Sequence, residues 1–225
     1  MSSQEYEDVP KLSVSLVVLG DSGVGKTCLI HRFIKGAFDN GYKPSTGQSY
    51  ASKTIEMPEI GKSIEINVID TAGQERYRSL TRIFYQGAKM VILVYDITNK
   101  NSFDNIKDWW YKDVKEHGDK NVIIGIAGNK SDEYDKEAVS EQEARDFAKS
   151  IGAVFSLTSA QNNSGIYKLF ENIGRKYLQL IYPNIESDMQ KKNQKEESNQ
   201  KIKIGEKDAD KKKEKQKNKK KHCIK

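Results

Sequence analysis

The sequence predicts an α/β fold: a mainly parallel six-stranded sheet with one antiparallel edge strand and helices on both faces. Three observations lead to this fold class. Strand-like segments alternate with segments of helical period along the chain. Most of these strand-like segments are almost continuously apolar, as the strands of a parallel sheet covered on both faces are. Two others are separated by a short turn at residues 58–61, which predicts one antiparallel hairpin.

The first predicted strand and helix flank a glycine-rich motif. Leu12–Leu19 is an apolar run rich in β-branched residues and is typical of a buried strand. Residues 20–27, GDSGVGKT, fit G-x-x-x-x-G-K-[ST], the phosphate-binding P-loop. A helix is expected over residues 26–35, and Gly36 ends it. A glycine-rich turn could fit this pattern by chance, but the strand before it and the helix after it are the context that the motif requires.

The remaining elements follow from the same reasoning. Residues 37–48 are polar and rich in turn residues, so we expect a loop. Further strands are expected at residues 50–57, 63–69, 89–95, 121–127 and 153–157. Helices are expected at residues 102–117, 141–150 and 165–180. Ser102 is a plausible N-cap for the first of these, and Ser140 with Glu143 forms a capping box for the second.

The charge of the chain is unevenly placed. Residues 183–225 contain 15 lysines and 8 acidic residues, whereas the rest of the chain has 23 basic and 24 acidic residues. A nearly neutral body argues against nucleic-acid binding by the folded part. Because the tail has no Leu, Val or aromatic residue, it cannot bury enough apolar surface to order itself. We therefore expect an N-terminal extension at 1–10, a domain at 11–182 and a disordered lysine-rich tail at 183–225.

Cysteine usage and the first residues indicate the compartment. Cys28 and Cys223 are too few for a disulfide framework, so reduced thiols are expected. The acidic N-terminus has no apolar signal region, and no apolar run reaches the length of a membrane span. These features predict a soluble cytoplasmic protein.

The P-loop motif carries a specific phosphate chemistry. Gly23 and Gly25 allow backbone angles and a close approach that a side chain would block. The N–H groups of the loop can then converge on a phosphate chain, helped by the positive end of the following helix. Lys26 can reach the β- and γ-phosphates, and the Thr27 hydroxyl can hold Mg²⁺. The sequence therefore predicts a nucleoside phosphate site.

Three further motifs stand at the ends of predicted strands, where ligands bind on open α/β sheets. They are Asp70–Arg76 (DTAGQER), Asn129–Asp132 (NKSD) and the pair Ser159-Ala160. With the P-loop they resemble the Ras-like small GTPases, and the segments at 77–81, 84–88 and 94–98 (YRSLT, FYQGA, VYDIT) resemble the Rab branch. The resemblance covers about residues 10–182 and implies the small G domain, a P-loop fold that binds GTP or GDP with Mg²⁺ and hydrolyses GTP.

The resemblance assigns a guanine site to the last two motifs. A carboxylate at Asp132 can accept two hydrogen bonds, from guanine N1–H and from the 2-amino group that adenine lacks. Asn129 would brace the loop, and the stem of Lys130 would lie along the base. Ser159 and the Ala160 N–H would close the pocket around guanine O6. Within the P-loop, the residues expected at the phosphates are then Asp21, Ser22, Gly23, Val24, Gly25, Lys26, Thr27 and Cys28.

The resemblance also implies the catalytic residues. Asp70 would hold Mg²⁺ through water, and the Gly73 N–H would meet the γ-phosphate. Gln74 would orient the attacking water. Nothing in the chain is an obvious arginine finger, so hydrolysis should be slow until a partner supplies the missing charge. These implications make the chain a GTPase switch.

The loop at 37–50 departs from the family pattern. Aligned on Tyr42 and Gly47, the sequence places Ser45, where the family has Thr, at the Mg²⁺-binding position. Phe38 would pack against the base edge and Tyr42 would close over the γ-phosphate, although both could instead be loop aromatics packed on the body.

Other departures affect partners more than phosphates. Ile69 replaces the Trp of Rab proteins, which would leave only Tyr50 and Tyr77 in the effector-facing aromatic cluster. Gln161 replaces the usual Lys after Ser-Ala. Trp109 and Trp110 are interpreted as packing residues.

Partners are expected at two segments and at the tail. Residues 37–50 and 70–82 would contact effectors, an exchange factor and a GTPase-activating protein. The lysine-rich segment at 211–225 would attract an anionic membrane surface on its cytosolic side. Cys223 is followed by only two residues, so it fits no common prenylation ending, and lipidation and an unmodified thiol both stay open. Two other functions also stay open: a GTP-binding adaptor with little turnover, and a P-loop protein directed to nucleic acid by its tail.

Overall fold

The computed structural model describes residues 11–37, 49–58, 61–71 and 78–183. The chain divides into two units, residues 1–181 and 182–225, and the fold described below is that of the first unit. Its strands are β1 (Lys11–Leu19), β2 (Ser49–Met57), β3 (Lys62–Asp70), β4 (Met90–Asp96), β5 (Ile123–Asn129) and β6 (Val154–Leu157). Its helices are α1 (Lys26–Lys35), α2 (Arg78–Tyr85), α3 (Lys100–Asn105), the π-helix η3 (Ile106–Trp110), α4 (Tyr111–His117), the 3₁₀-helix η4 (Ser131–Lys136), α5 (Glu141–Ser150) and α6 (Ile166–Ile181).

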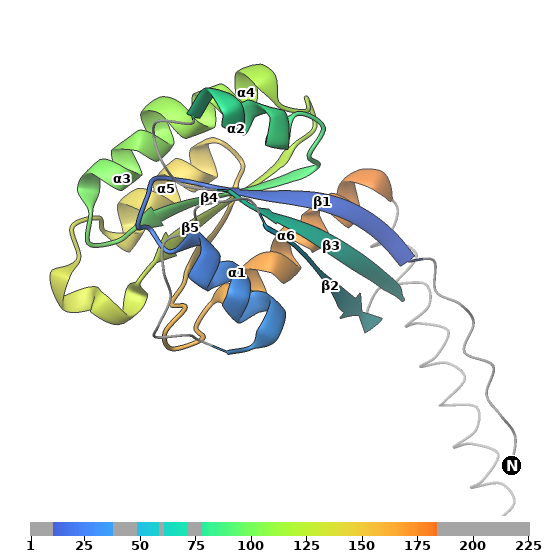
Figure 1. The fold of residues 1–225 in the computed structure, drawn as a ribbon, viewed down its shortest axis with the longest axis horizontal. Coiled ribbons are helices and arrows are strands. Elements are labelled where there is room, and N and C mark those ends of the chain that lie inside the picture. The colour runs from blue at the N-terminus through green and yellow to red at the C-terminus, as the bar shows by residue number, and fades with distance from the viewer. Residues whose placement is uncertain (1–10, 38–48, 59–60, 72–77, 184–225) are drawn as a thin grey trace, which may run out of the picture. The chain divides into compact units, whose positions relative to one another are not determined.

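The predicted fold class is confirmed. The six strands form one sheet in the order β2-β3-β1-β4-β5-β6 (Figure 1). The edge pair β2–β3 is antiparallel, and every other neighbouring pair is parallel. β4 and β5 are buried along their whole length, as their continuous apolar runs predicted. β3 instead alternates between buried and half-buried residues, which is the pattern of a strand near the edge of the sheet.

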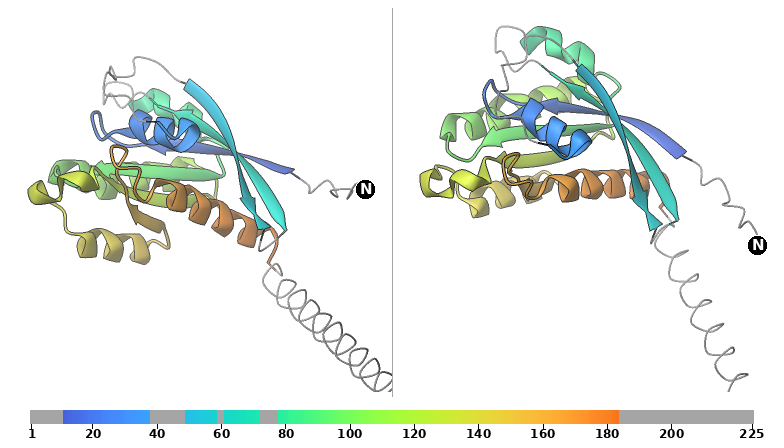
Figure 2. Two further views of the ribbon diagram at one scale, coloured as in Figure 1. Left: turned by 90° about the horizontal axis from the view of Figure 1, so that it is seen from below. Right: turned by 60° about the horizontal axis from the view of Figure 1, so that its bottom comes forward.

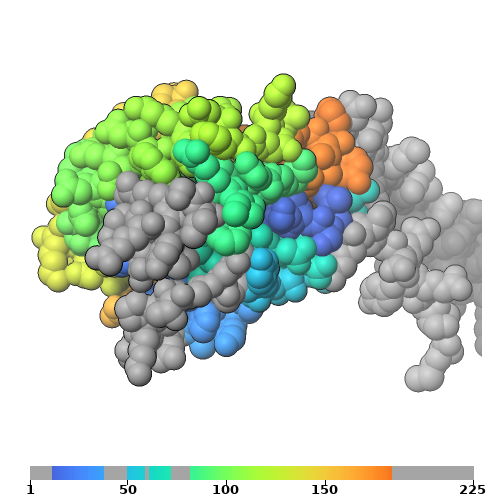
Figure 3. Space-filling view, turned by 45° about the horizontal axis from the view of Figure 1, so that its top comes forward, coloured from blue at the N-terminus to red at the C-terminus, as the bar shows by residue number. Residues whose placement is uncertain are grey.

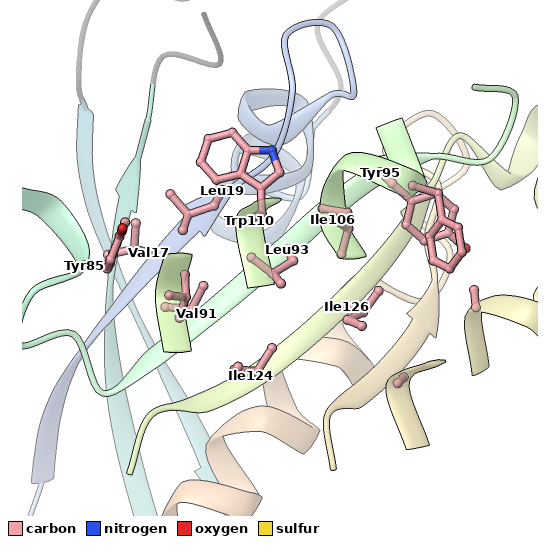
Figure 4. Close-up of a cluster of buried hydrophobic side chains, with 14 of the residues drawn as sticks. Val17, Leu19, Tyr85, Val91, Leu93, Tyr95, Ile106, Trp110, Ile124 and Ile126 are labelled. Atoms are coloured by element: carbon pink, nitrogen blue, oxygen red, sulfur yellow. The ribbon is translucent and has the colours of Figure 1, made fainter. Parts of the chain in front are cut away.

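Helices cover both faces of the sheet. On one face, α2, the continuous rod of α3, η3 and α4, and α5 contribute side chains to the same core as β1, β4 and β5 (Figure 4). Figure 3 shows this side of the domain, with the green surface of α2 beside the lighter green surface of the rod. On the other face, α1 and α6 pack together through the Phe33 and Phe170 rings, whose centroids are 3.7 Å apart. Figure 2 shows α6 lying along the sheet, where Gly174 is close to Ile64 of β3.

The helix predicted at 102–117 differs from the structure in two ways. It begins at Lys100, because Asn99 is the N-cap: its side chain accepts a hydrogen bond from the Ser102 N–H. Ser102, the predicted cap, lies inside the helix. The middle of the segment is a π-helix, in which the Tyr111 N–H donates to the Ile106 carbonyl five residues earlier. Hydrophobic spacing could not reveal it, since apolar residues three and four apart are expected in either helix.

Two short helices were not predicted. α2 begins within the segment at 70–82 that was assigned to partner contacts, and η4 begins within the Asn129–Asp132 motif. In contrast, Ser140 caps α5 as predicted, because its side chain accepts a hydrogen bond from the Glu143 N–H at 3.2 Å. Cooperative tertiary packing, such as burial of Tyr85 at the end of α2, stabilises helices whose sequence signal is weak.

Candidate functional site

The predicted site residues gather at one edge of the sheet. The four parallel strands β1, β4, β5 and β6, with β3, run in the same direction, so their carboxyl ends meet there. Residues 20–25 follow β1, Asp70 ends β3, Asn129 ends β5 and Ser159 follows β6. Segments far apart in the sequence thus form one surface.

The loop at 20–25 has the backbone that a phosphate cradle requires. Gly20, Gly23 and Gly25 all have positive φ, at 142°, 79° and 92°. A Cβ on Gly20 would lie 2.2 Å from the Val94 carbonyl oxygen, and one on Gly25 would lie 2.4 Å from Asn129 Nδ2. Only glycine therefore fits at these two positions. The N-terminus of α1 has no side-chain cap, so its N–H groups point toward the loop and suit an anion.

Lys26 lies beneath this loop. Its ammonium donates to the Gly20 carbonyl at 2.9 Å and to the Asp21 carbonyl at 2.8 Å. Burial lowers the pKa of Lys26 to about 8, although the nearby Asp70 and Asp21 carboxylates oppose the shift. A buried ammonium that meets mainly carbonyl dipoles can gain much from a phosphate anion.

Asp70 is the second buried charge on this side of the site. It is 1% exposed, and within the described part of the chain its Oδ1 has no hydrogen-bond partner. Burial raises the pKa of Asp70, and a hydrogen bond with the Thr27 side chain and the charge of Lys26 oppose that rise. Thr27 and Asp70 thus bring a hydroxyl and a carboxylate together, a set of oxygen ligands that fits Mg²⁺.

The Asn129 side chain joins three segments of the site. Its Nδ2 donates to the Val24 carbonyl of the phosphate loop at 2.8 Å, and its Oδ1 accepts from the Thr158 hydroxyl at 3.2 Å. The next residue, Lys130, has a positive φ of 64°, and its Nζ lies 2.6 Å from Asp96 Oδ2. Burial alone would raise the pKa of Asp96, but hydrogen bonds from Lys130 and Thr98 hold it below its ordinary value.

Asp132 and the loop after β6 are also held by hydrogen bonds. The Ser159 hydroxyl donates to Asp132 Oδ1 at 2.5 Å and accepts from the Asn162 N–H at 2.9 Å. Ser159 and Ser164 exchange two backbone hydrogen bonds across the loop. This segment is therefore shaped before any ligand enters, and one carboxylate faces it.

Arg32 of α1 fastens that loop to the phosphate side. Its Nε donates to the Ala160 carbonyl at 2.8 Å, and its Nη2 donates to the Gln161 carbonyl at 2.9 Å. No sequence motif assigned a role to Arg32, Asp96 or Thr158. Asp96 could have been found as a polar residue at the end of an apolar strand, whereas the reach of Arg32 across 128 residues leaves no sequence signal.

The remaining predicted residues lie outside the described part of the chain. These are Phe38, Tyr42, Ser45, Gly73, Gln74, Tyr77 and Cys223. Tyr50 is described and is exposed, at 70%. Among the described helices, none is long and apolar enough to cross a membrane.

Comparison with known proteins identifies the family. The Ras family pattern matches residues 15–179. The chain is 41% identical to human Ras-related protein Rab-22A over 164 residues. This alignment covers 72% of this chain and 82% of that protein. It is 40% identical to bovine Ras-related protein Rab-8A over 192 residues, which are 84% of this chain and 87% of that protein. It is 42% identical to human Ras-related protein Rab-8B over 160 residues, which are 71% of this chain and 76% of that protein.

These matches span the phosphate loop, the base-side loops and the sheet that carries both. Rab-like proteins are switches that regulate vesicle traffic. The chain therefore belongs to the Ras family: it is a Rab-like small GTPase that binds guanine nucleotide with Mg²⁺ and hydrolyses GTP.

Proposed function

We propose that residues 21–28 hold the phosphates of GTP and GDP through their backbone N–H groups. The observation that best supports this assignment is the pair of buried charges behind the loop. Lys26 is only 5% exposed, and Asp70 Oδ1 has no partner within the described residues. On binding, the Lys26 ammonium exchanges carbonyl contacts for phosphate oxygens.

The Mg²⁺ ligands in this proposal come from three segments. Thr27 supplies a hydroxyl, Asp70 supplies a carboxylate oxygen through water, and Ser45 supplies the second hydroxyl. Mg²⁺, when bound, neutralises charge on the phosphate oxygens. The hydrogen bond between Thr27 and Asp70 supports the first two assignments.

Guanine selectivity is assigned to Asp132. Its carboxylate accepts from guanine N1–H and from the 2-amino group, so adenine would leave it unpaired. The Ser159 hydroxyl, which donates to Asp132, fixes the direction of that carboxylate. The Ala160 N–H and the stem of Lys130 complete the pocket, and Asn129 braces it against the phosphate loop.

Hydrolysis is assigned to Gln74, which orients the attacking water, with Gly73 at the γ-phosphate. Phe38 and Tyr42 cover the nucleotide from the other loop. The segments at 37–50 and 70–82 carry the contacts with effectors, an exchange factor and a GTPase-activating protein. The lysine-rich tail holds the switch at an anionic membrane surface on the cytosolic side, with or without lipid on Cys223.

Single-turnover hydrolysis tests the catalytic assignment. The full chain, loaded with GTP in the presence of Mg²⁺, should hydrolyse it slowly, and Gln74→Leu should reduce the rate constant about tenfold or more. Gln86→Leu is the matched control, because Gln86 is an exposed glutamine just after α2. Tight GTP binding with no turnover in any of the three proteins would instead establish a GTP-binding adaptor.

Vesicle flotation tests the membrane assignment. The full chain should float with vesicles that contain anionic lipid and not with neutral vesicles, and added salt should release it. Replacing the lysines of 211–221 by glutamine should abolish flotation. Flotation that survives this change would point to a lipid on Cys223, whereas RNA binding without flotation would favour the tail-directed nucleic-acid function.

A further inference from the structure

The Asp21 side chain is held by a part of the domain outside the nucleotide loops. Its Oδ2 accepts from Asn105 Nδ2 at 2.6 Å, and its Oδ1 accepts from Trp110 Nε1 at 2.9 Å. Asn105 ends α3 and Trp110 ends η3, more than 80 residues beyond the phosphate loop. Figure 4 shows the indole of Trp110 above Leu19, the last residue of β1. Both oxygens of a phosphate-loop carboxylate are therefore engaged by one helical rod.

The π-helix places these two donors side by side. In an α-helix, residues five apart point about 140° away from each other, so Asn105 and Trp110 would not share a face. The i→i+5 geometry, seen in the hydrogen bond from the Tyr111 N–H to the Ile106 carbonyl, widens the turn and brings residues five apart closer to one face. The unusual helix thus has a consequence at the nucleotide loop.

Core packing fixes the rod that carries the two donors. Trp110 is 3% exposed, and Phe103, Ile106 and Val114 of the same rod are fully buried in the core beneath it. Because this packing sets the position of the rod, the rod can in turn position Asp21. The rod therefore offers two preorganised hydrogen-bond donors.

Holding Asp21 has two effects on a bound phosphate chain. The Asp21 carbonyl accepts from Lys26 Nζ at 2.8 Å, so fixing this residue also fixes a contact of the phosphate-binding ammonium. In addition, a carboxylate in a phosphate loop repels the ligand if it turns inward. Pairing with Asn105 and Trp110 directs the carboxylate toward the rod and offsets part of its charge.

We propose that Asn105 and Trp110 are positioning residues that slow nucleotide release by holding the phosphate loop through Asp21. This inference rests on the proposed function of residues 21–28. It adds a determinant of nucleotide residence time that belongs to neither the nucleotide-binding motifs nor the segments at 37–50 and 70–82.

Release of a fluorescent GDP analogue from the full chain, with Mg²⁺, tests the proposal. Trp110→Phe keeps an aromatic ring but removes the indole N–H, and Asn105→Ala removes the second donor. Each should accelerate release about tenfold, since each removes a hydrogen bond to a charged group. Trp109→Phe makes the same chemical change one residue earlier in η3 and should leave release within about twofold of wild type.

A double-mutant cycle separates positioning from a general structural effect. If Trp110 acts through Asp21, the double variant Asp21→Ala/Trp110→Phe should release GDP no faster than Asp21→Ala alone. Effects that multiply would contradict the proposal, because they would show that the two residues act independently. Asn105→Ala in the same cycle gives a second test if Trp110→Phe lowers the melting temperature.

The outcomes also distinguish this inference from the proposed function. A wild-type chain that fails to bind the GDP analogue would overturn the assignment of residues 21–28. Wild-type binding, with Trp110→Phe and Asn105→Ala releasing GDP at the rate of Trp109→Phe, would overturn only the positioning role.

Discussion

The two sides of the nucleotide site are built differently. On the base side, Asn129, Asp132 and Ser159 are joined by hydrogen bonds within the protein, which leave the loops shaped in advance. On the phosphate side, Lys26 is a buried ammonium held mainly by carbonyl groups, and Asp70 carries a buried oxygen without a partner among the described residues. The proposed base side is satisfied by the protein itself, whereas we propose that a bound ligand completes the phosphate side.

This difference has a thermodynamic consequence. Buried polar groups that pair with each other stabilise the fold, and removing one leaves its partner unsatisfied. Buried charges without full compensation cost stability until a ligand of opposite charge arrives. Removing a paired polar group on the base side should therefore weaken both folding and binding, whereas removing a buried charge on the phosphate side should weaken binding without weakening folding.

Lys26→Met should have the largest effect. We expect the affinity for GDP to fall about a hundredfold or more, because the phosphates lose their buried cation. The nucleotide-free protein should melt no lower than wild type, since removal of a buried charge offsets the loss of its hydrogen bonds to the Gly20 and Asp21 carbonyls. Calorimetric titration and thermal melting measure the two effects, with Lys35→Met at the exposed end of α1 as the control. A lower melting temperature of the nucleotide-free protein would contradict the comparison.

Asn129→Ala should weaken binding and folding together. The change leaves the Val24 carbonyl and the Thr158 hydroxyl without their partner, so the free energy of unfolding should fall by about 1–3 kcal/mol. GDP affinity should fall about tenfold, because the base-side loop loses its brace. Urea unfolding without nucleotide measures the first effect, with Asn101→Ala, at an exposed position of α3, as the control. Unchanged stability would show that the base side is not held as described.

Asp70→Asn should weaken Mg²⁺-dependent GDP binding and, unlike Asn129→Ala, stabilise the nucleotide-free protein. Folding raises the pKa of Asp70, so the folded protein holds this proton more tightly than the unfolded chain does. Stability from this group is therefore lost as the pH rises through the folded pKa, and the ionised carboxylate destabilises the nucleotide-free protein at neutral pH. The free energy of unfolding of the variant should be about 1 kcal/mol higher than that of wild type, and its GDP affinity should no longer respond to Mg²⁺. A Mg²⁺ response equal to that of wild type would contradict the role of Asp70.

The pH dependence of binding offers a finer test of the phosphate side. The pKa of Lys26 is about 8 in the empty site, and phosphates favour its protonated form. As the pH rises above that value, binding must take up a proton, so GDP affinity should fall about threefold between about pH 7.5 and 8.5. Calorimetry in buffers of different ionisation enthalpy should show the proton uptake. Affinity that is flat over this range would contradict a lowered pKa at Lys26.

Tyr95→Phe should have the smallest effect, and it tests whether one buried hydroxyl near the base side is left without a hydrogen bond. The Tyr95 hydroxyl is buried beside Gly128 of β5 and has no hydrogen-bond partner within the described residues. Removing it should raise the free energy of unfolding by up to about 1 kcal/mol, since the hydroxyl gains nothing from burial. Chemical unfolding measures the change, and GDP affinity should stay as in wild type. A loss of stability would reveal a hydrogen bond that the structure lacks.

Most of the fold could be predicted from the sequence, because the signals that specify it are local. The apolar runs of β4 and β5 and the cap at Ser140 predicted their elements to within a few residues. The π-helix could not be predicted, since apolar spacing is compatible with either helix. α2 was missed because its stability comes from packing, in which Tyr85 is buried against the rod.

The motifs predicted where the site lies but not what holds it together. Their residues were placed at strand ends by a rule of parallel sheets. The contacts of Arg32, Asn105 and Trp110 cross 80 to 130 residues of sequence, and no local pattern records such a pairing. Trp110 was interpreted as a packing residue; it is buried, but its indole N–H also reaches the phosphate loop.

Thermal unfolding of the full chain, first freed of nucleotide, tests the central difference most directly. Melting temperatures should be compared without nucleotide, with GDP and Mg²⁺, with GDP and a chelator, and with ADP and Mg²⁺. We predict a large rise in melting temperature with GDP and Mg²⁺, a smaller rise with GDP and the chelator, and none with ADP and Mg²⁺. An unchanged melting temperature with GDP and Mg²⁺ would contradict the claim that this ligand completes the phosphate side.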